Sequence, residues 1–158
     1  MALTAQSETF ETIISEIEAL APIHWQEVAT HKQAREYAPD WDGFKRAEAA
    51  GRLYCVTLRD GDKLVGYNIG FYFTESHVKG RWVAQADAYY ILPEYRAVGA
   101  RFLFLQTEKI LAAHPTHPAE TIHYQAKPTN GAGPFLAAMG YDQTSVVFSK
   151  LLKKVPDG

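Results

Sequence analysis

Apolar residues recur every three to four positions over residues 8–20, and this spacing predicts an amphipathic helix near the start of the chain. The repeating positions are Phe10, Ile13, Ile14, Ile17 and Leu20. Pro22 fits the first turn of a second helix, which is expected to run to about Lys32. Asp42 is a suitable N-cap for a short third helix over Gly43–Ala50. The first third of the chain is therefore predicted to be mainly helical.

The hydrophobic period then changes from helical spacing to strand spacing. Leu53–Arg59 and Leu64–Phe73 are predicted strands, and the Asp-Gly-Asp sequence at 60–62 is a strong hairpin signal between them. Trp82–Leu92 is rich in β-forming residues and is expected to be the central strand. It leads into a predicted helix over Gly99–Ala113. The middle of the chain thus predicts the body of a sheet.

The last third is predicted to hold a strand over Thr121–Gln125, a helix over Gly133–Met139, and one or two strands over Tyr141–Leu152. The first of these strands should return parallel to Trp82–Leu92 through a right-handed crossover. This order predicts an α+β fold, with a mixed, mostly antiparallel twisted sheet flanked by helices and a splayed parallel strand pair where a ligand can bind. We expect one domain over 1–158, with N-terminal helices and a substrate-side loop in 1–52, a sheet core in 53–152 and a tail in 153–158.

Composition and charge narrow the class of protein. A chain of 158 residues with 47% apolar residues can bury roughly 70% of the surface that it exposes when unfolded. A net charge of −2 argues against a broad nucleic-acid-binding face. Cys55 is the only cysteine and the six histidines are scattered, so no metal site is expected. Without an apolar run long enough to span a bilayer or a signal-peptide pattern, the prediction is a cytoplasmic protein without membrane contact.

Residues 88–108 join an apolar strand, a turn that contains Arg96 and Gly99, and a helix. The first turn of a helix has amide groups without intrahelical partners and a partial positive charge, so it is a natural site for a diphosphate. Gly99 would let the backbone approach the phosphates and adopt the dihedral angles of an anion-binding nest. An ordinary packing turn would give the same local pattern.

This segment resembles the GNAT superfamily of acyl-CoA N-acyltransferases, in particular its small phage-encoded members. Tyr89–Arg96 is similar to that family's V-x-P-x-x-R strand end, and Arg96–Arg101 is similar to its phosphate loop, R/Q-x-x-G-x-G/A. The stretch 130–141 is similar to its second signature, an Asn followed by a short helix that ends in Gly-Phe or Gly-Tyr. The resemblance covers about Leu53–Leu152 and little of residues 1–50.

The resemblance implies that acetyl-CoA is bound as a cosubstrate, without a metal, and that its pantetheine arm lies against the strand edge almost as an added strand. Ile91 is expected to supply the backbone contacts. Two residues depart from the family pattern: Arg101 stands where Gly or Ala is usual, and Leu136 replaces a Tyr that protonates the departing thiolate. Tyr124 and Tyr141 are the substitutes in view for that acid. The implied cofactor-binding residues are Ile91, Leu92, Arg96, Ala97, Val98, Gly99, Ala100, Arg101 and Asn130.

Direct transfer to an amine needs a base, because a lysine-like amine with a pKa of about 10.4 is mostly protonated at pH 7. Asp87 and His77 are the catalytic candidates, with Glu75 as a third. Asp87 interrupts an apolar strand, where a carboxylate would have a raised pKa unless it were paired, for example with Lys127 or an arginine. His77 lies in a polar loop, where it is either a base, a substrate contact or simply a solvated side chain.

Three functions follow from these observations. The first is an acetyl-CoA-dependent N-acetyltransferase acting on an unidentified amine of a protein, a metabolite or a modified base. The second is a non-catalytic protein of the same fold that binds CoA or a host partner, which Arg101 and Leu136 both favour. The third is an interaction or inhibitor protein without a cofactor. A homodimer through the sheet edge at Ser145–Leu152 is also open.

Overall fold

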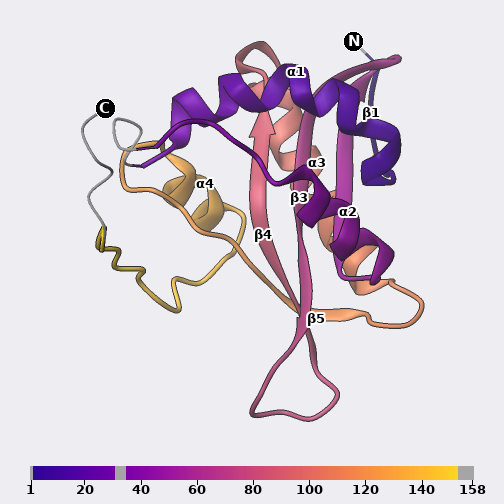
Figure 1. Ribbon diagram of the computed structural model, residues 1–158, viewed down its shortest axis with the longest axis vertical. Helices are drawn as coiled ribbons and strands as arrows, with labels where there is room; N and C mark the ends of the chain where they lie inside the picture. Colours follow the sequence, from indigo (N-terminus) through magenta and orange to yellow (C-terminus); the bar gives the residue numbers. More distant parts are fainter. Residues whose placement is uncertain (1, 31–34, 153–158) are drawn as a thin grey trace. The chain divides into compact units, whose positions relative to one another are not determined.

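The computed structural model describes residues 2–30 and 35–152 (Figure 1). The chain separates into two units, which are described one at a time. The first contains the residues up to Glu18 together with Asp40–Gln125, and the second contains Ala19–Pro39 and the residues from Ala126 onward. The expectation of a single domain over 1–158 stays a prediction. The whole sheet and the predicted phosphate-binding segment belong to the first unit.

The first unit is built on a five-stranded sheet in the order β1-β2-β3-β4-β5. Neighbouring strands from β1 to β4 are antiparallel, whereas β4 and β5 are parallel. The predicted fold class is therefore confirmed. The expectation that Trp82–Leu92 is the central strand is wrong, because β3 lies in the middle and the corresponding strand β4 lies next to the edge. The strands are β1 (Leu3–Ser7), β2 (Leu53–Asp60), β3 (Lys63–Thr74), β4 (Trp82–Ile91) and β5 (Ala119–His123).

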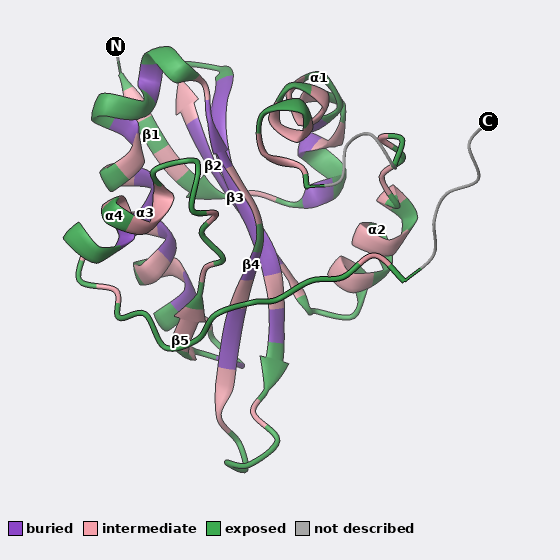
Figure 2. Cartoon of the chain, turned by 90° about the vertical axis from the view of Figure 1, so that its left-hand side faces the viewer, coloured by how far each residue is buried: buried purple, intermediate pink, exposed green. Residues whose placement is uncertain are grey.

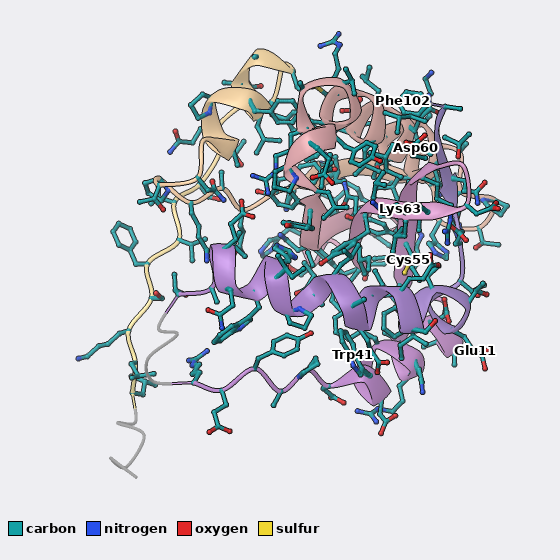
Figure 3. All side chains as sticks on the ribbon, turned by 90° about the horizontal axis from the view of Figure 1, so that it is seen from above. Glu11, Trp41, Cys55, Asp60, Lys63 and Phe102 are labelled. Atoms are coloured by element: carbon teal, nitrogen blue, oxygen red, sulfur yellow. The ribbon has the colours of Figure 1, made fainter. Side chains whose placement is uncertain are left out.

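Turn chemistry sets the register between β2 and β3. Gly61 has a φ of +59°, a conformation that glycine adopts at no steric cost, so the chain reverses at the predicted position. Asp60 then pairs with Lys63, and both side chains can be found at this turn in Figure 3. Asp60 also accepts hydrogen bonds from the amide of Ala2 (2.9 Å) and the hydroxyl of Tyr95 (3.1 Å). The hairpin therefore anchors both the N-terminal strand and the segment before α3.

Helices cover both faces of this sheet (Figure 2). On one face α3 (Arg96–Ala112) contributes Leu103 to the same buried core cluster as Leu58 of β2. On the other face α2 (Trp41–Ala49) places Phe44 within 5.7 Å of the ring of Phe71 and 5.2 Å of the ring of Phe10. Figure 3 shows Trp41 at the start of α2 and the sulfur of Cys55 among the buried side chains. Cys55 is buried in the core as expected, and this burial raises the pKa of its thiol.

The N-terminal segment differs from the prediction in two ways. Strand β1 was not anticipated, because only Leu3 and Ala5 reach the core and its pairing with β2 leaves no strong pattern in the sequence. The predicted first and second helices are one helix, α1 (Phe10–Val28), which contains Pro22. A proline removes one N–H donor, but it does not by itself end a helix. The predicted end near Lys32 lies outside the described residues.

The N-cap of α2 is Asp40 and not the predicted Asp42. Its carboxylate accepts a hydrogen bond from the amide of Gly43 at 2.8 Å, and the helix begins at Trp41. Asp40 and Asp42 are both suitable capping residues, and the sequence alone favours neither. Glu48 of the same helix accepts hydrogen bonds from the amides of Phe10 and Glu11, so α2 also caps the start of α1.

An ion-pair network fastens the start of α1 to β2. The Arg59 guanidinium binds the carboxylates of Glu8 (2.8 Å) and Glu16 (2.7 Å) and the carbonyl oxygen of Asp62 (2.7 Å). Thr57 donates a further hydrogen bond to Glu8. Desolvation acts to raise the pKa of Glu8, but the hydrogen bonds from Arg59 and Thr57 outweigh it and hold the pKa below its ordinary value. The network satisfies charges that would be costly to bury singly.

In the second unit, α4 (Ala132–Ala138) confirms the predicted short helix near Gly133–Met139. The predicted strands over Tyr141–Leu152 are not formed, and residues 141–152 contain neither helix nor strand. Val146, Val147 and Phe148 are largely exposed there, with Phe148 at 93%. β-branched and aromatic residues favour a strand only when a neighbouring strand packs against them. The predicted tail at 153–158 lies outside the described residues.

A cluster of aromatic and histidine rings packs in the first unit around the start of β4. The rings of His114 and His117 stack at 3.6 Å, and His117 lies 4.6 Å from Tyr72 and 4.7 Å from Trp82. Arg52 lies over the ring of Trp82 at 4.8 Å. Burial lowers the pKa of His117, the charges of His114 and Arg52 lower it further, and a backbone interaction with Gly51 acts in the opposite direction. The folded protein therefore favours neutral His117.

We expect the free energy of unfolding to fall as the pH drops below about 6.5, the ordinary pKa of histidine. The unfolded chain binds a proton at His117 more readily than the folded chain does, so stability is lost between the ordinary pKa and the lowered one. His117→Phe keeps a ring in the cluster and should reduce this loss. Urea unfolding at several pH values measures it. If His117→Phe and the wild type show the same pH dependence of the free energy of unfolding, the lowered pKa is not that of His117. Between pH 7 and 9 the difference in this free energy between the two proteins should be constant.

Candidate functional site

Strand β5 pairs along its whole length, but only with the first half of β4. Their parallel register runs from Trp82 opposite Ala119 to Gln85 opposite His123, where β5 ends. Beyond this point β4 continues to Ile91, whereas the segment that follows β5 runs through Tyr124 and Gln125 without strand structure. We call these two segments, 86–91 and 124–125, the β4–β5 divergence. It is the splayed parallel pair that the sequence predicted, and its backbone groups on the inner side are not joined by sheet pairing.

The main chain of Ile91 faces the β4–β5 divergence. The amide of Leu92 donates to Val65 of β3 at 2.9 Å, and alternate residues along a strand direct their main-chain groups to opposite sides. Ile91, one residue earlier, therefore directs its N–H and C=O away from β3. The guanidinium of Arg96 confirms this direction, because its Nε donates to the Ile91 carbonyl oxygen at 2.9 Å. Both polar main-chain groups of Leu92 have protein partners, since its carbonyl oxygen accepts from Tyr95.

Helix α3 begins at Arg96, directly after a short 3-10 turn over Pro93–Tyr95, so Arg96 to Arg101 are helical and do not form the predicted loop. The N-cap residue is Tyr95, and no side chain caps this helix end. Arg96 and Ala97 are exposed, and Val98 is 57% exposed. The amide of Arg96 already donates to the carbonyl oxygen of Pro93, so a ligand could use only the first-turn amides that follow it, together with roughly half a positive charge at this helix end. The end of β4 thus leads straight into a site suited to a diphosphate.

The reason for glycine at position 99 differs from the one predicted. Gly99 is helical and buried, and a Cβ there would lie 2.6 Å from Cδ2 of the buried Leu58. The absence of a side chain lets α3 approach β2 closely, and no left-handed nest is formed. Ala100 is partly buried against the core and Arg101 is exposed. The side chain of Arg101 therefore leaves the packing of α3 undisturbed.

Asp87 is the extra residue of a β-bulge. Ala86 pairs with Gly70 and Ala88 with Ile69, so Asp87 has no partner on β3 and strand alternation does not fix its direction. The residue is exposed, yet the protein around its carboxyl group desolvates it and raises its pKa. A structural ion pair would lower the pKa instead. The direction of the shift therefore favours a base over a structural salt bridge.

The structure does not bring His77 close to Asp87. His77 is exposed in the loop between β3 and β4, before Trp82 begins the strand. Five residues of strand separate Trp82 from Asp87, which corresponds to roughly 17 Å. Glu75, the third candidate, forms an ion pair with Arg81 at 3.3 Å in the same hairpin. Both side chains thus lie toward the end of β4 that is paired with β5.

Asn130 belongs to the second unit, whose position relative to the first is not defined. Its side-chain oxygen accepts a hydrogen bond from the amide of Ala132 at 3.1 Å, which supports the start of α4. Leu136, at the position of the family's Tyr, is buried with 7% exposure. The structure therefore gives Asn130 a local role, and a role in cofactor binding stays a prediction.

Several solved structures with the same arrangement are acetyltransferases. An aminoglycoside acetyltransferase, HMB0005, from an uncultured soil metagenomic sample aligns with a TM-score of 0.75 and 14% identity, covering 97% of this chain and 100% of its own. Another from such a sample, meta-AAC0020 in complex with sisomicin, aligns with a TM-score of 0.73 and 13% identity over 96% and 97% of the two chains. The fold is that of the GNAT N-acetyltransferases.

A ribosomal-protein-alanine N-acetyltransferase from Brucella melitensis biovar Abortus 2308 also shares the GNAT fold, with a TM-score of 0.67 and 18% identity over 94% of this chain and 99% of its own. No protein-family model and no curated protein sequence matches the chain. The predicted resemblance to the GNAT superfamily is thus confirmed at the level of the fold. Its closer relation to phage-encoded members stays a prediction.

Sequence reasoning missed a set of side-chain hydrogen bonds at the β4–β5 divergence. Asn68, which is completely buried on β3, accepts from the hydroxyl of Tyr54 (3.2 Å) and donates to the hydroxyl of Tyr124 (2.7 Å). The hydroxyl of Tyr89 donates to the carbonyl oxygen of Gln125 (2.7 Å). An asparagine within a run of apolar and aromatic strand residues was the one available signal, because such a residue needs buried partners.

Among the residues that the structure describes, no group of three or more His, Cys, Asp or Glu side chains could hold a metal ion. Within the same part of the chain, no helix has both the length and the apolar character needed to cross a membrane.

Proposed function

We propose that this protein is an acetyl-CoA-dependent N-acetyltransferase that transfers the acetyl group directly to an amine. The observation that carries the proposal is the continuity of two features along one segment. The main chain of Ile91 faces the β4–β5 divergence, and five residues later α3 begins with an exposed first turn that has no side-chain cap. The strand suits the amides of a pantetheine arm, and the helix end suits a diphosphate.

The chain can supply what direct transfer needs. In our proposal the amide of Ile91 donates to ligand groups along the strand edge, and a donor of this kind polarises a thioester carbonyl and stabilises the oxyanion. In our proposal Asp87 removes the proton that the attacking amine loses as the C–N bond forms. The C–S bond then breaks, and CoA leaves as a thiolate, which is a fair leaving group because thiol pKa values lie near 8.5.

We propose a primary amine as the acceptor, on a protein, a metabolite or a modified base. Two structural neighbours are aminoglycoside acetyltransferases and another is a ribosomal-protein-alanine N-acetyltransferase, so small polyamines and protein amines are the first classes to test. Mass spectrometry of cells that express the protein, searching for added acetyl groups, identifies the acceptor without a prior choice. A His77→Ala variant tests whether the exposed loop contacts that acceptor.

A second candidate is a protein that binds CoA without turnover. Buried Leu136 favours it, because this position cannot supply the proton that many family members deliver to the thiolate. Binding with no acetyl transfer to any amine, and no thioester hydrolysis, would support this reading over the first.

Acetyl-CoA at about a hundredfold excess over its dissociation constant should stabilise the fold by about 2.7 kcal/mol, which raises the melting temperature by several degrees. Acetyl-pantetheine, which lacks the nucleotide, should bind more weakly. Val98→Asp should weaken acetyl-CoA binding about tenfold by placing a negative charge beside the diphosphate. Loss of the helix would not explain this result, because an acidic residue in the first turn stabilises a helix by about 0.3–1 kcal/mol. Isothermal titration measures these affinities.

Val98→Asn is the matched neutral control and should bind acetyl-CoA like the wild type. Equal affinities of the Asp and Asn variants would contradict a diphosphate at the start of α3. If acetyl-CoA does not stabilise the wild type, both the transferase and the CoA-binding protein are excluded. The remaining function is then the third one, an interaction or inhibitor protein that uses no cofactor.

A further inference from the structure

At the β4–β5 divergence, the kind of contact that joins β4 to the β5 segment changes abruptly. Up to Gln85 and His123 they are joined by the parallel sheet register. The next two residues, Tyr124 and Gln125, are instead held through side chains, by Asn68 and Tyr89. The bulge at Asp87 interrupts the register of β4 at the same level. Three independent features thus oppose continued pairing at one place.

The two phenol rings that make these links are themselves firmly placed. The ring of Tyr124 stacks on Phe104 of α3 at 4.8 Å, and the ring of Tyr89 meets Tyr124 edge-on at 5.4 Å. Tyr89 also lies 5.6 Å from Phe104. Asn68 is fixed in turn by the hydroxyl of Tyr54, within the core. Rings held on several sides keep their hydroxyl groups at set distances from the strands.

We propose that Tyr89 and Tyr124 are positioning residues that hold the β4–β5 divergence open for the acyl-CoA cosubstrate. The Gln125 carbonyl oxygen is satisfied by Tyr89 and therefore gains little from pairing with β4. Asn68 holds Tyr124 from the far side of β4 and fixes where the chain leaves β5. A site organised in advance binds more tightly, because ligand binding does not have to separate paired strands.

This inference rests on the proposed function and deepens it. Tyr89→Phe and Tyr124→Phe each remove one hydroxyl group and keep the ring. Each should raise the dissociation constant and the KM for acetyl-CoA by about 3- to 10-fold, the effect of one net hydrogen bond. The kcat of Tyr89→Phe at saturating acetyl-CoA should stay close to that of the wild type. The same is expected of Tyr124→Phe, because the present proposal gives Tyr124, named above as a substitute acid, a positioning role through Asn68. A large loss of kcat in Tyr124→Phe would overturn that role. Tyr72→Phe is the control and should leave acetyl-CoA binding unchanged, because Tyr72 is a buried residue of β3 that pairs with Ala84, before the β4–β5 divergence.

Hydrogen exchange tests the inference without any ligand. If the two hydroxyl groups hold the segments 86–91 and 124–125 apart, their loss should let Gln125 pair with β4. The amides of both segments should then exchange more slowly in the Phe variants than in the wild type. Unchanged or faster exchange overturns the positioning role, as does slower exchange without weaker binding. If the wild type fails to bind acetyl-CoA, the proposed function is wrong. The exchange measurement still decides whether these tyrosines keep the two segments apart.

Discussion

Asp87→Asn is expected to lower kcat by about 10²- to 10⁴-fold at pH 7 and to leave the affinity for acetyl-CoA nearly unchanged. General-base catalysis contributes an effect of this size, and an amide of the same shape cannot accept the proton. Because Asp87 is an exposed bulge residue, the substitution should not disturb the core. Steady-state kinetics with an identified amine acceptor, together with titration of acetyl-CoA binding, separates the two quantities.

The pH profile gives a second reading of the same residue. Desolvation raises the pKa of Asp87, so the carboxylate is protonated at a higher pH than an ordinary aspartate, whose pKa is about 3.9. Activity of the wild type should therefore be lost on acidification as the base takes up a proton, and this acid limb should be absent from the Asn variant. Glu75→Gln is the matched control, since Glu75 pairs with Arg81 in the hairpin. A kcat unchanged in Asp87→Asn would remove the base assignment.

Local chemistry explains which parts of the fold could be predicted from the sequence. Nearby residues determine the hairpin at Gly61, the strands on either side of it and the segment from β4 into α3. The patterns of these elements are therefore visible in the sequence. Strand β1 depends on pairing with β2, which lies about fifty residues away in the sequence, and its own sequence shows no strong strand pattern. The segment 141–152 shows the converse, because its apolar residues favour a strand that the structure does not pair.

The candidate site divides in the same way. The diphosphate-binding end of α3 could be predicted, because it needs only a strand followed closely by a helix. The start of that helix at Arg96 and the packing role of Gly99 could not, since the second depends on Leu58 in a distant strand. The bulge at Asp87 was hidden for a similar reason. A bulge is a mismatch between two strands, and the sequence of one strand does not show it.

Gly70→Ala is expected to lower the free energy of unfolding by about 3 kcal/mol, at the upper end of the cost of overpacking a core. A Cβ at Gly70 would meet the carbonyl oxygen of Gln85, which belongs to the backbone and cannot move aside, and would lie 2.6 Å from the hydroxyl of Tyr54. Urea unfolding measures the loss. Gly133→Ala is the control, because a Cβ there has only Ala126 Cβ at 4.0 Å and alanine favours a helix.

The position of Gly70 links this loss of stability to the candidate site. Gly70 pairs with Ala86, at the edge of the bulge that presents Asp87, and Tyr54 holds Asn68 and through it Tyr124. A methyl group at Gly70 should therefore displace both the base and the support of the β4–β5 divergence, and acetyl-CoA binding should weaken even in the fraction that remains folded. Wild-type stability and affinity in Gly70→Ala would show that β3 and β4 can separate locally at little cost, and the bulge would then be too soft to position Asp87.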